Sequence, residues 1–474
     1  MLSGCSSAPS EEVAVETPAL SAAQLDATFG QNGLAPVFPA QFQRSRLLPD
    51  GRLLVAGIGA ELAGSGQVPV VVVRYTESGQ LDPTFAEGGV WKSLVSTPDT
   101  GSFDAAGNVS IAVGTDGRIH VVANVFTSER LVHFPRTVVA ARLLSDGEVD
   151  PSALNVAGGP WRKVADVGSG NWSMDAAVAP DGRLLVLTHR SPYVLRLDDD
   201  LQQDAAFAAQ IAQGTAYHHY AGALNAHSIV VAPSGDMVLG GALDQSPHSI
   251  IVRVKPDGSA SGKAFAFPGQ SVWNNPGKGY FELEAIAVTP SGRIVGAGTL
   301  RDSAIQPGST RAETRNFVFA FDANDELDAS FGTGGISVVN PTVDPHVSFP
   351  IAGSAVSRSA SRGHGFHGVT VDGAGRILAS GESNGAPIIT RFLADGTPDE
   401  SFGDEGTVSL DQLKLPAITT IEAEDQLPRS YVGAGVHVAP NGRIVLALAR
   451  PEKLVAGTSQ EARRPRIGAA ALAP

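Results

Sequence analysis

LLPDGRLLVAG, at residues 47–57, is the first of seven versions of one β-hairpin in this chain. Each version places apolar residues on both sides of Asp-Gly, Ser-Gly, Ala-Gly or Asn-Gly. This pattern predicts a two-residue turn whose glycine adopts a positive φ. The other versions are VGTDGRIHVVA at 113–123, VAPDGRLLVLT at 178–188, VAPSGDMVLGG at 231–241, VTPSGRIVGAG at 288–298, VDGAGRILASG at 371–381 and VAPNGRIVLAL at 438–448.

A second motif alternates with the hairpins, and it also occurs seven times. An apolar segment such as VVVVRYTESG (70–79) lies between hairpin and motif in most repeats. Each repeat, about 65 residues long, is therefore predicted to hold four strands: A and B from the hairpin, C from the apolar segment, and D at the second motif. The copies of the motif are QLDATFGQNG at 24–33, QLDPTFAEGG at 80–89, EVDPSALNVAGG at 148–159, LQQDAAFAAQIAQG at 201–214, SASGKAFAFPG at 259–269, ELDASFGTGG at 326–335 and TPDESFGDEG at 397–406.

Seven four-stranded repeats without intervening helical patterns favour an all-β fold, a seven-bladed β-propeller. One D motif precedes the first hairpin and none follows the last. We therefore expect the N-terminal strand to complete the last blade and close the ring. Residues 25–474 form a single propeller domain in this interpretation, and Trp91 and Trp161 pack between blades.

The combination of Leu-Asp-Pro-Ser/Thr-Phe-Gly with Pro-Asp-Gly-Arg resembles the delta-60 repeat family, a propeller-like repeat of exported bacterial proteins. The resemblance covers nearly all of residues 25–474, although the third and fourth repeats lack the Phe-Gly or Leu-Asp element. It implies the propeller fold, but the family has no agreed activity to transfer.

The composition suits a turn-rich sheet protein, with 54 Gly, 31 Pro and 17% charged residues. A net charge of −14 repels phosphate backbones, so we expect no nucleic-acid partner. No apolar run approaches the roughly 18 residues of a transmembrane helix. We expect a monomer.

The single cysteine, Cys5, lies in Leu2-Ser3-Gly4-Cys5, which resembles a bacterial lipobox. Residues 1–24 are interpreted as a lipobox remnant followed by a flexible tether, with the signal peptide's earlier regions missing from the sequence. The resemblance implies lipidation of Cys5 and a location in the bacterial cell envelope, at the outer membrane. The alternative is a chance tetrapeptide at the N-terminus of a cytosolic protein.

The tight A-to-B and C-to-D turns fall on one face of the predicted ring, and the long D-to-A and B-to-C connections fall on the other. Long loops on a rigid scaffold are frequent binding surfaces. Aromatic rings in these loops could stack on a glycan or a peptide, or could instead cover the open end of the core. The candidates are Trp172, Tyr217, Tyr220, Trp273 and Tyr280.

Polar residues at the start of strand A predict a site at the mouth of the central channel. Gln43, His227, Glu284 and His367 each lie eight residues before a hairpin glycine, and radial symmetry would bring them together. The alternative is that they only end strands beside water. His364 and His367 form a His-x-x-His pair, but loops lack the helical register that aims histidines at one ion, so we expect no metal and no cofactor.

Two classes of function fit these residues. The first is a non-enzymatic binding or scaffolding propeller that recognises a glycan, a peptide or an envelope protein through its long-loop face. The second is a hydrolase or lyase acting on carbohydrate, with Glu284 as general acid or base and His227 or His367 assisting.

Overall fold

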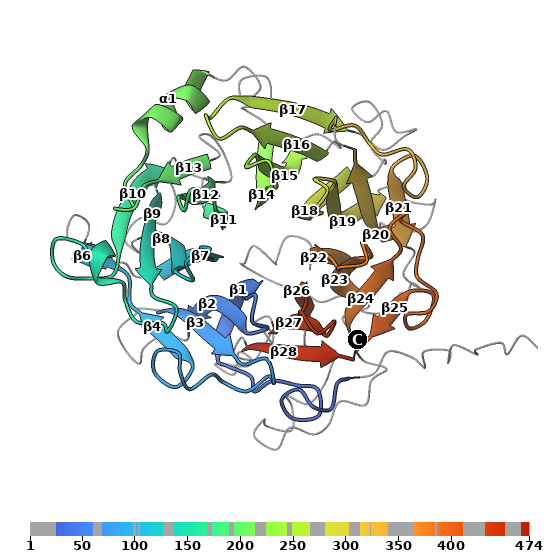
Figure 1. Ribbon diagram of the computed structural model, residues 1–474, viewed down its shortest axis with the longest axis horizontal. Coiled ribbons are helices and arrows are strands. Elements are labelled where there is room, and N and C mark those ends of the chain that lie inside the picture. Colours follow the sequence, from blue (N-terminus) through green and yellow to red (C-terminus); the bar gives the residue numbers. More distant parts are fainter. Residues whose placement is uncertain are drawn as a thin grey trace, which may run out of the picture.

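The computed structural model describes residues 25–59, 69–97, 101–102, 105–126, 136–167, 173–188, 194–213, 224–243, 249–265, 280–302, 313–322, 324–339, 364–383, 386–410, 432–450 and 466–473. Seven antiparallel sheets stand around a central axis, which confirms the seven-bladed propeller (Figure 1). The first strand of each blade lies innermost, so the channel is lined by seven equivalent strands.

The seven blades follow the repeats in chain order. They consist of β1 (Ala40–Leu47), β2 (Leu53–Gly59), β3 (Val70–Tyr75) and β4 (Val90–Ser93); β7 (Ala105–Val113), β8 (Ile119–Phe126), β9 (Arg136–Leu143) and β10 (Arg162–Val167); β11 (Ser173–Val178), β12 (Leu184–Thr188) and β13 (Val194–Leu197); β14 (Leu224–Val231), β15 (Met237–Leu243), β16 (Ser249–Val254) and β17 (Ala260–Phe265); β18 (Tyr280–Val288), β19 (Ile294–Asp302), β20 (Glu313–Phe321) and β21 (Ile336–Val339); β22 (His364–Val371), β23 (Ile377–Ser383), β24 (Ala386–Phe392) and β25 (Thr407–Ser409); and β26 (Val432–Val438), β27 (Ile444–Arg450) and β28 (Arg466–Leu472). The short pair β5 (Ser96–Thr97) and β6 (Gly101–Ser102) lies outside the blades.

The hairpin turns are longer than the predicted two residues. In blade 1 the N–H of Gly51 donates to the carbonyl of Leu48, and the N–H of Leu48 donates to Arg52, so five residues separate the strands. Pro49 suits the second position of a type I turn, after which Gly51 takes a positive φ of 83°. The other six hairpin glycines have φ values between 79° and 86°.

Blade 3 departs from the four-stranded pattern, because its outer element is helix α1 (Ala205–Gln213). The segment is rich in alanine, the strongest helix former. Asp204 accepts hydrogen bonds from the N–H groups of Ala206 and Phe207 and so caps the helix. Phe207 and Ile211 lie one turn apart and are buried against the blade, so the helix covers the sheet as a fourth strand would.

The N-terminal segment closes the ring, as predicted. Residues 25–38, which we call the clasp, pair with β28 of blade 7. Five backbone hydrogen bonds join them, among them Asp26 N–H to Ala471 O at 2.9 Å and Ala35 N–H to Ala469 O at 2.8 Å. Blade 7 therefore receives its fourth strand from the start of the chain.

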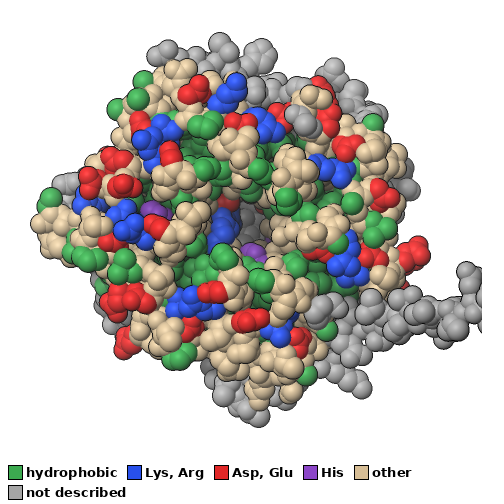
Figure 2. Space-filling view, in the orientation of Figure 1, with side chains coloured by type: hydrophobic (Ala, Val, Ile, Leu, Met, Phe, Trp, Pro, Cys, Tyr) green, Lys and Arg blue, Asp and Glu red, His purple; other side chains and the backbone are tan. Residues whose placement is uncertain are grey.

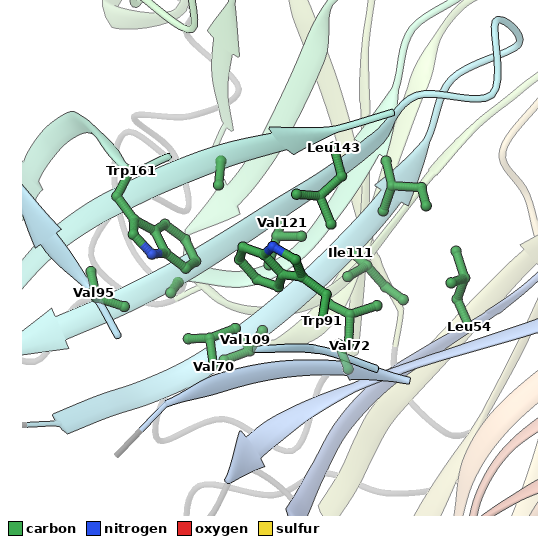
Figure 3. Packing of buried hydrophobic residues seen from close by; sticks show 14 of the residues in the cluster. Leu54, Val70, Val72, Trp91, Val95, Val109, Ile111, Val121, Leu143 and Trp161 are labelled. Carbon is green, nitrogen blue, oxygen red and sulfur yellow. The ribbon is translucent and has the colours of Figure 1, made fainter. Parts of the chain in front are cut away.

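Hydrophobic clusters fill the spaces between neighbouring blades. In the second strand of each blade, successive side chains point alternately toward the two neighbouring blades. Leu54 of β2 therefore packs toward blade 2, and Val55 packs toward blade 7. Figure 3 shows the cluster between blades 1 and 2, where the ring centroids of Trp91 and Trp161 lie 5.8 Å apart. This confirms the predicted position of both tryptophans.

The second motif joins adjacent blades through a set of contacts that we call the latch. In blade 1 the Asp82 carboxylate accepts a hydrogen bond from Arg74 Nε at 2.7 Å, and Arg74 also donates to the carbonyl of Ser145 in blade 2. Phe85 lies so close to Gly147 of blade 2 that a Cβ there would be 2.6 Å from its ring. The same pair occurs as Arg142 with Asp150, Arg196 with Asp204, and Arg391 with Asp399. In blades 5 and 7 the arginine that follows the hairpin glycine pairs with the aspartate instead, as Arg293 with Asp328 and Arg443 with Asp26.

Candidate functional site

Each of the seven innermost strands contains a β-bulge near its start. In β14 the register passes from Ala226 to Ser228 and skips His227. A bulge bends the strand and changes the direction in which a side chain points, which is why bulges are frequent near functional sites. The register skips one residue in each strand, and these residues are Gln43, Gly107, Met174, His227, Glu284, His367 and Ala434.

Three of the four predicted channel residues come together at these bulges. His227, Glu284 and His367, from blades 4, 5 and 6, line a cavity of about 140 Å³ that we call the chamber. The Nδ1 atom of His227 lies 3.6 Å from Oε2 of Glu284. Gln43 is buried but does not line the chamber, and its Nε2 atom has no hydrogen-bond partner.

The electrostatics of the chamber keep Glu284 ionised. Burial alone would raise the pKa of Glu284, but the contact with His227 and the electrostatic interactions with His367 and Arg44 outweigh burial and lower it. Burial lowers the pKa of His367 and favours its neutral imidazole, although Glu284 acts in the opposite direction. A carboxylate beside imidazole rings can accept hydrogen bonds or protons at neutral pH.

Two arginines from blade 1 cross the channel to blade 3. Arg46 Nη2 lies 2.7 Å from Oδ1 of Asp175, and Arg44 Nε lies 3.5 Å from the same oxygen. Asp175 directly follows the bulge of β11, and Arg44 directly follows the bulge of β1. The sequence prediction missed these three residues because it selected only the bulged position itself. The alternating Gln-Arg-Ser-Arg at 43–46 was the available signal.

Blade 7 contributes a close contact with blade 1 in the chamber wall. Ser45 Oγ lies 2.9 Å from Nε2 of His437. Burial and the nearby Arg46 lower the pKa of His437 to about 3, so its imidazole is neutral. A Cβ on Gly435 would lie 2.6 Å from Ser45 Oγ, so a larger residue there would displace this hydroxyl from His437.

A second cavity, of about 600 Å³, continues the channel toward the tight-turn face, and we call it the vestibule. It reaches Pro49 and Thr115 in the A-to-B turns, and it shares Arg46, Asp175 and Ser228 with the chamber. Figure 2 shows a hollow at the centre of the ring, bordered by hydrophobic side chains, with basic and histidine side chains inside it. The arginine–aspartate bridge therefore separates a polar chamber from a largely apolar vestibule.

The aromatic residues that were predicted to lie in the long loops fall almost entirely outside the described residues. Trp172, Tyr217, Tyr220 and Trp273 lie outside the described residues, and only the backbone of Tyr280 is described, at the start of β18. Cys5 and the rest of 1–24 also lie outside them.

The described residues contain neither a candidate metal-binding cluster nor a membrane-spanning helix. Among them, no three His, Cys, Asp or Glu side chains are grouped in a way that could hold a metal ion. In the same part of the chain, no helix is long and apolar enough to cross a membrane.

Similar solved structures are distant in sequence. Virginiamycin B lyase from Staphylococcus aureus, solved as an inactive variant with quinupristin, is 8% identical with a TM-score of 0.43, covering 92% of this chain and 99% of that chain. A gluconolactonase from Xanthomonas campestris is 13% identical with a TM-score of 0.31, covering 92% and 97%. A luciferin-regenerating enzyme is 10% identical with a TM-score of 0.36, covering 95% of both chains. The TM-scores are below 0.5, so the function of this chain has to be argued from its own residues.

Comparison of sequences gives one family. No curated protein matches the chain. Residues 48–85 and 375–402 match the family described as "Domain of unknown function (DUF5122) beta-propeller". The first segment runs from the turn of blade 1 to Phe85 of its latch, and the second runs from Gly375 to Phe402 in blade 6. The match supports a propeller repeat family, in agreement with the seven blades.

Proposed function

We propose that this protein is a non-enzymatic binding propeller whose chamber takes a polar part of a glycan or peptide ligand. The supporting observation is the convergence of charged and polar side chains from separate blades around a cavity. Arg44 and Arg46 offer N–H donors, whereas Glu284 and Asp175 offer acceptors. Hydroxyl and amide groups, which both donate and accept, match such a mixed lining.

The ligand enters from the long-loop face in this proposal. The bulged residues lie at the starts of the innermost strands, on the side where the D-to-A connections enter. Aromatic residues of those connections, Trp172, Tyr217, Tyr220 and Trp273, would add stacking surface around the chamber. An envelope glycan, peptide or protein is therefore the partner class that we propose.

The substitution Glu284→Gln tests this site. Soluble protein is screened by calorimetry against envelope oligosaccharides and peptides, and a ligand found for the parent is then titrated into the variant. We expect affinity to fall about 10- to 100-fold, because a hydrogen bond to a charged group contributes about 1.5–3 kcal/mol.

Glu382→Gln serves as the matched control. Glu382 is buried in β23 and does not line the chamber, and burial raises its pKa to about 7. The control should bind the ligand as the parent does. Equal affinity of the parent and Glu284→Gln would contradict the proposed site.

The pairing of Glu284 with His227 also favours a second candidate, a hydrolase or lyase acting on carbohydrate. A buried carboxylate with a lowered pKa, beside an imidazole, has the form of a general base at neutral pH. In this case Glu284→Gln should abolish turnover of an oligosaccharide while its binding is retained. Lost affinity without turnover in the parent would instead indicate a binding protein.

We further propose that the propeller is anchored to the outer membrane through a lipid on Cys5. The support is the lipobox-like Leu-Ser-Gly-Cys and the composition of 6–24. Expressed behind a bacterial lipoprotein signal sequence, the protein should incorporate labelled palmitate and sediment with membranes, whereas Cys5→Ala should be soluble. The same distribution of both forms between membrane and soluble fractions would contradict the anchor.

A further inference from the structure

We infer that the vestibule is a second binding site, which takes the alkyl chain of a small carboxylate whose head group reaches Arg46. This goes beyond the proposed function, because the site opens on the opposite face of the ring and takes an amphipathic ligand rather than a glycan or peptide. The inference rests on the lining of the vestibule, its volume and the charges at its inner end.

The vestibule wall is built from the same position of successive repeats. Leu47, Val113, Val178, Val231 and Val288 each begin the hairpin motif, and all five line this cavity. One side of each packs against a cluster between blades, yet each remains partly exposed toward the channel. Apolar side chains that stay exposed in a cavity indicate a site that buries apolar surface of a ligand.

The volume of the vestibule suits a small molecule. At about 600 Å³ it lies within the range of about 300–1,000 Å³ that is common for ligand pockets. The chamber is smaller, at about 140 Å³. Besides Arg46, Thr115, Asp175 and Ser228, the described lining of the vestibule consists of apolar residues and Gly114, so an alkyl chain fits its walls.

The inner end of the vestibule favours an anionic head group. Arg44 and Arg46 share the carboxylate of Asp175, and Arg44 also interacts with the ionised Glu284 on the chamber side, so Arg46 is the cation at the vestibule side, with Asp175 as a shared counter-ion. Arg46 donates to Ser45 O, Asp175 Oδ1 and Ala176 O. A guanidinium has five N–H donors, so two of them have no acceptor among the described residues. A carboxylate arriving from the vestibule meets these two donors.

The test uses octanoate as the probe. Acetate, which has the carboxylate but no long chain, and octanol, which has the chain but no carboxylate, are the controls. Calorimetry on the soluble protein should show octanoate binding at least tenfold more tightly than octanol, and acetate binding should be undetectable. Ala287→Glu places a negative charge on the vestibule wall outside the chamber, and it should weaken octanoate binding at least tenfold. The matched control is Val156→Glu, because Val156 is 98% exposed outside the channel.

Several results would overturn the inference. They are absent octanoate binding, equal binding of octanol, equal weakening by Val156→Glu, or unchanged binding by Ala287→Glu. Should Ala287→Glu not fold, the nearly isosteric Val231→Thr replaces it, with a smaller but measurable loss expected. Glu284→Gln affects the chamber and not the vestibule, so octanoate binding to that variant separates this inference from the proposed function.

Discussion

Deletion of the clasp, residues 25–38, is expected to make the protein aggregate and to lower its stability. Phe29, Leu34 and Ala35 of the clasp are buried, and the two larger side chains alone stabilise the fold by about 3–6 kcal/mol. That amount is comparable with the whole stability of a typical domain, about 5–15 kcal/mol. The deletion would also expose the unpaired edge of β28 to other molecules.

Size-exclusion chromatography and thermal unfolding measure this effect. Deletion of residues 6–24 is the control, since the predicted tether should leave both the melting temperature and the elution volume unchanged. The single substitution Phe29→Ala tests the same contact between clasp and ring with a smaller change. It is expected to lower the free energy of unfolding by about 3–5 kcal/mol. A monomeric clasp deletion with an unchanged melting temperature would show that the ring closes without it.

Arg142→Met, which removes the latch between blades 2 and 3, is expected to cost about 3–5 kcal/mol, because it leaves the buried Asp150 carboxylate with only the half-exposed Arg118 as an ionic partner. The side chains of Arg142 and Asp150 are only 6% and 3% exposed, and their ion-pair distance is 2.8 Å. Arg142 also donates to the carbonyl of Asp199 in blade 3 at 2.7 Å. Urea unfolding at pH 7 measures the loss.

The pH dependence gives a second measurement on the same variant. Hydrogen bonds from Ser152 and interactions with Arg142 outweigh burial and lower the pKa of Asp150 to about 2. The stabilisation from this carboxylate is therefore complete above its unfolded pKa, near 4, and is lost as the pH falls toward 2. In Arg142→Met the pKa of Asp150 rises, so acid unfolding should begin at a higher pH.

Arg118→Met is the matched control, because Arg118 reaches the same Asp150 carboxylate at 3.0 Å but its side chain is 44% exposed. Solvent screens such a contact, so the control should unfold close to the parent. Equal destabilisation by both substitutions would mean that burial of the latch does not determine its strength.

Most of the architecture could be predicted from the sequence, because the residues that form the turns recur in every repeat. Each blade contains one hairpin glycine and one copy of the second motif, so counting them gave the number of blades and the closure of the ring. The helix of blade 3 was missed because residues 201–214 were interpreted as one of the seven copies of the second motif. The segment Ala205–Gln213 is nevertheless rich in helix formers. The name of the repeat family, delta-60, stays a prediction.

The chamber could be predicted only in part. His227, Glu284 and His367 were found from their equal spacing to the hairpin glycines, and the structure places them in one cavity. The same spacing selected Gln43, which is buried and does not line the cavity. The direction of a side chain at a bulge depends on local backbone geometry, which spacing does not encode. Arg46 and Asp175 meet across the channel between nonadjacent blades, and the spacing of the repeat does not predict which residues of such blades pair.

The bulge at the start of every innermost strand allows selection for ligand recognition and selection for the scaffold to act on different residues. A bulged residue is skipped by the strand register, and the latch and turn residues that define the repeat lie elsewhere in the blade. Mutations at the four bulged positions that line the chamber, His227, Glu284, His367 and Ala434, can therefore change what the channel recognises while selection on the scaffold continues. Propellers with the same repeat signature should diverge in ligand, and a library randomised at these four codons would explore new specificities on one fold.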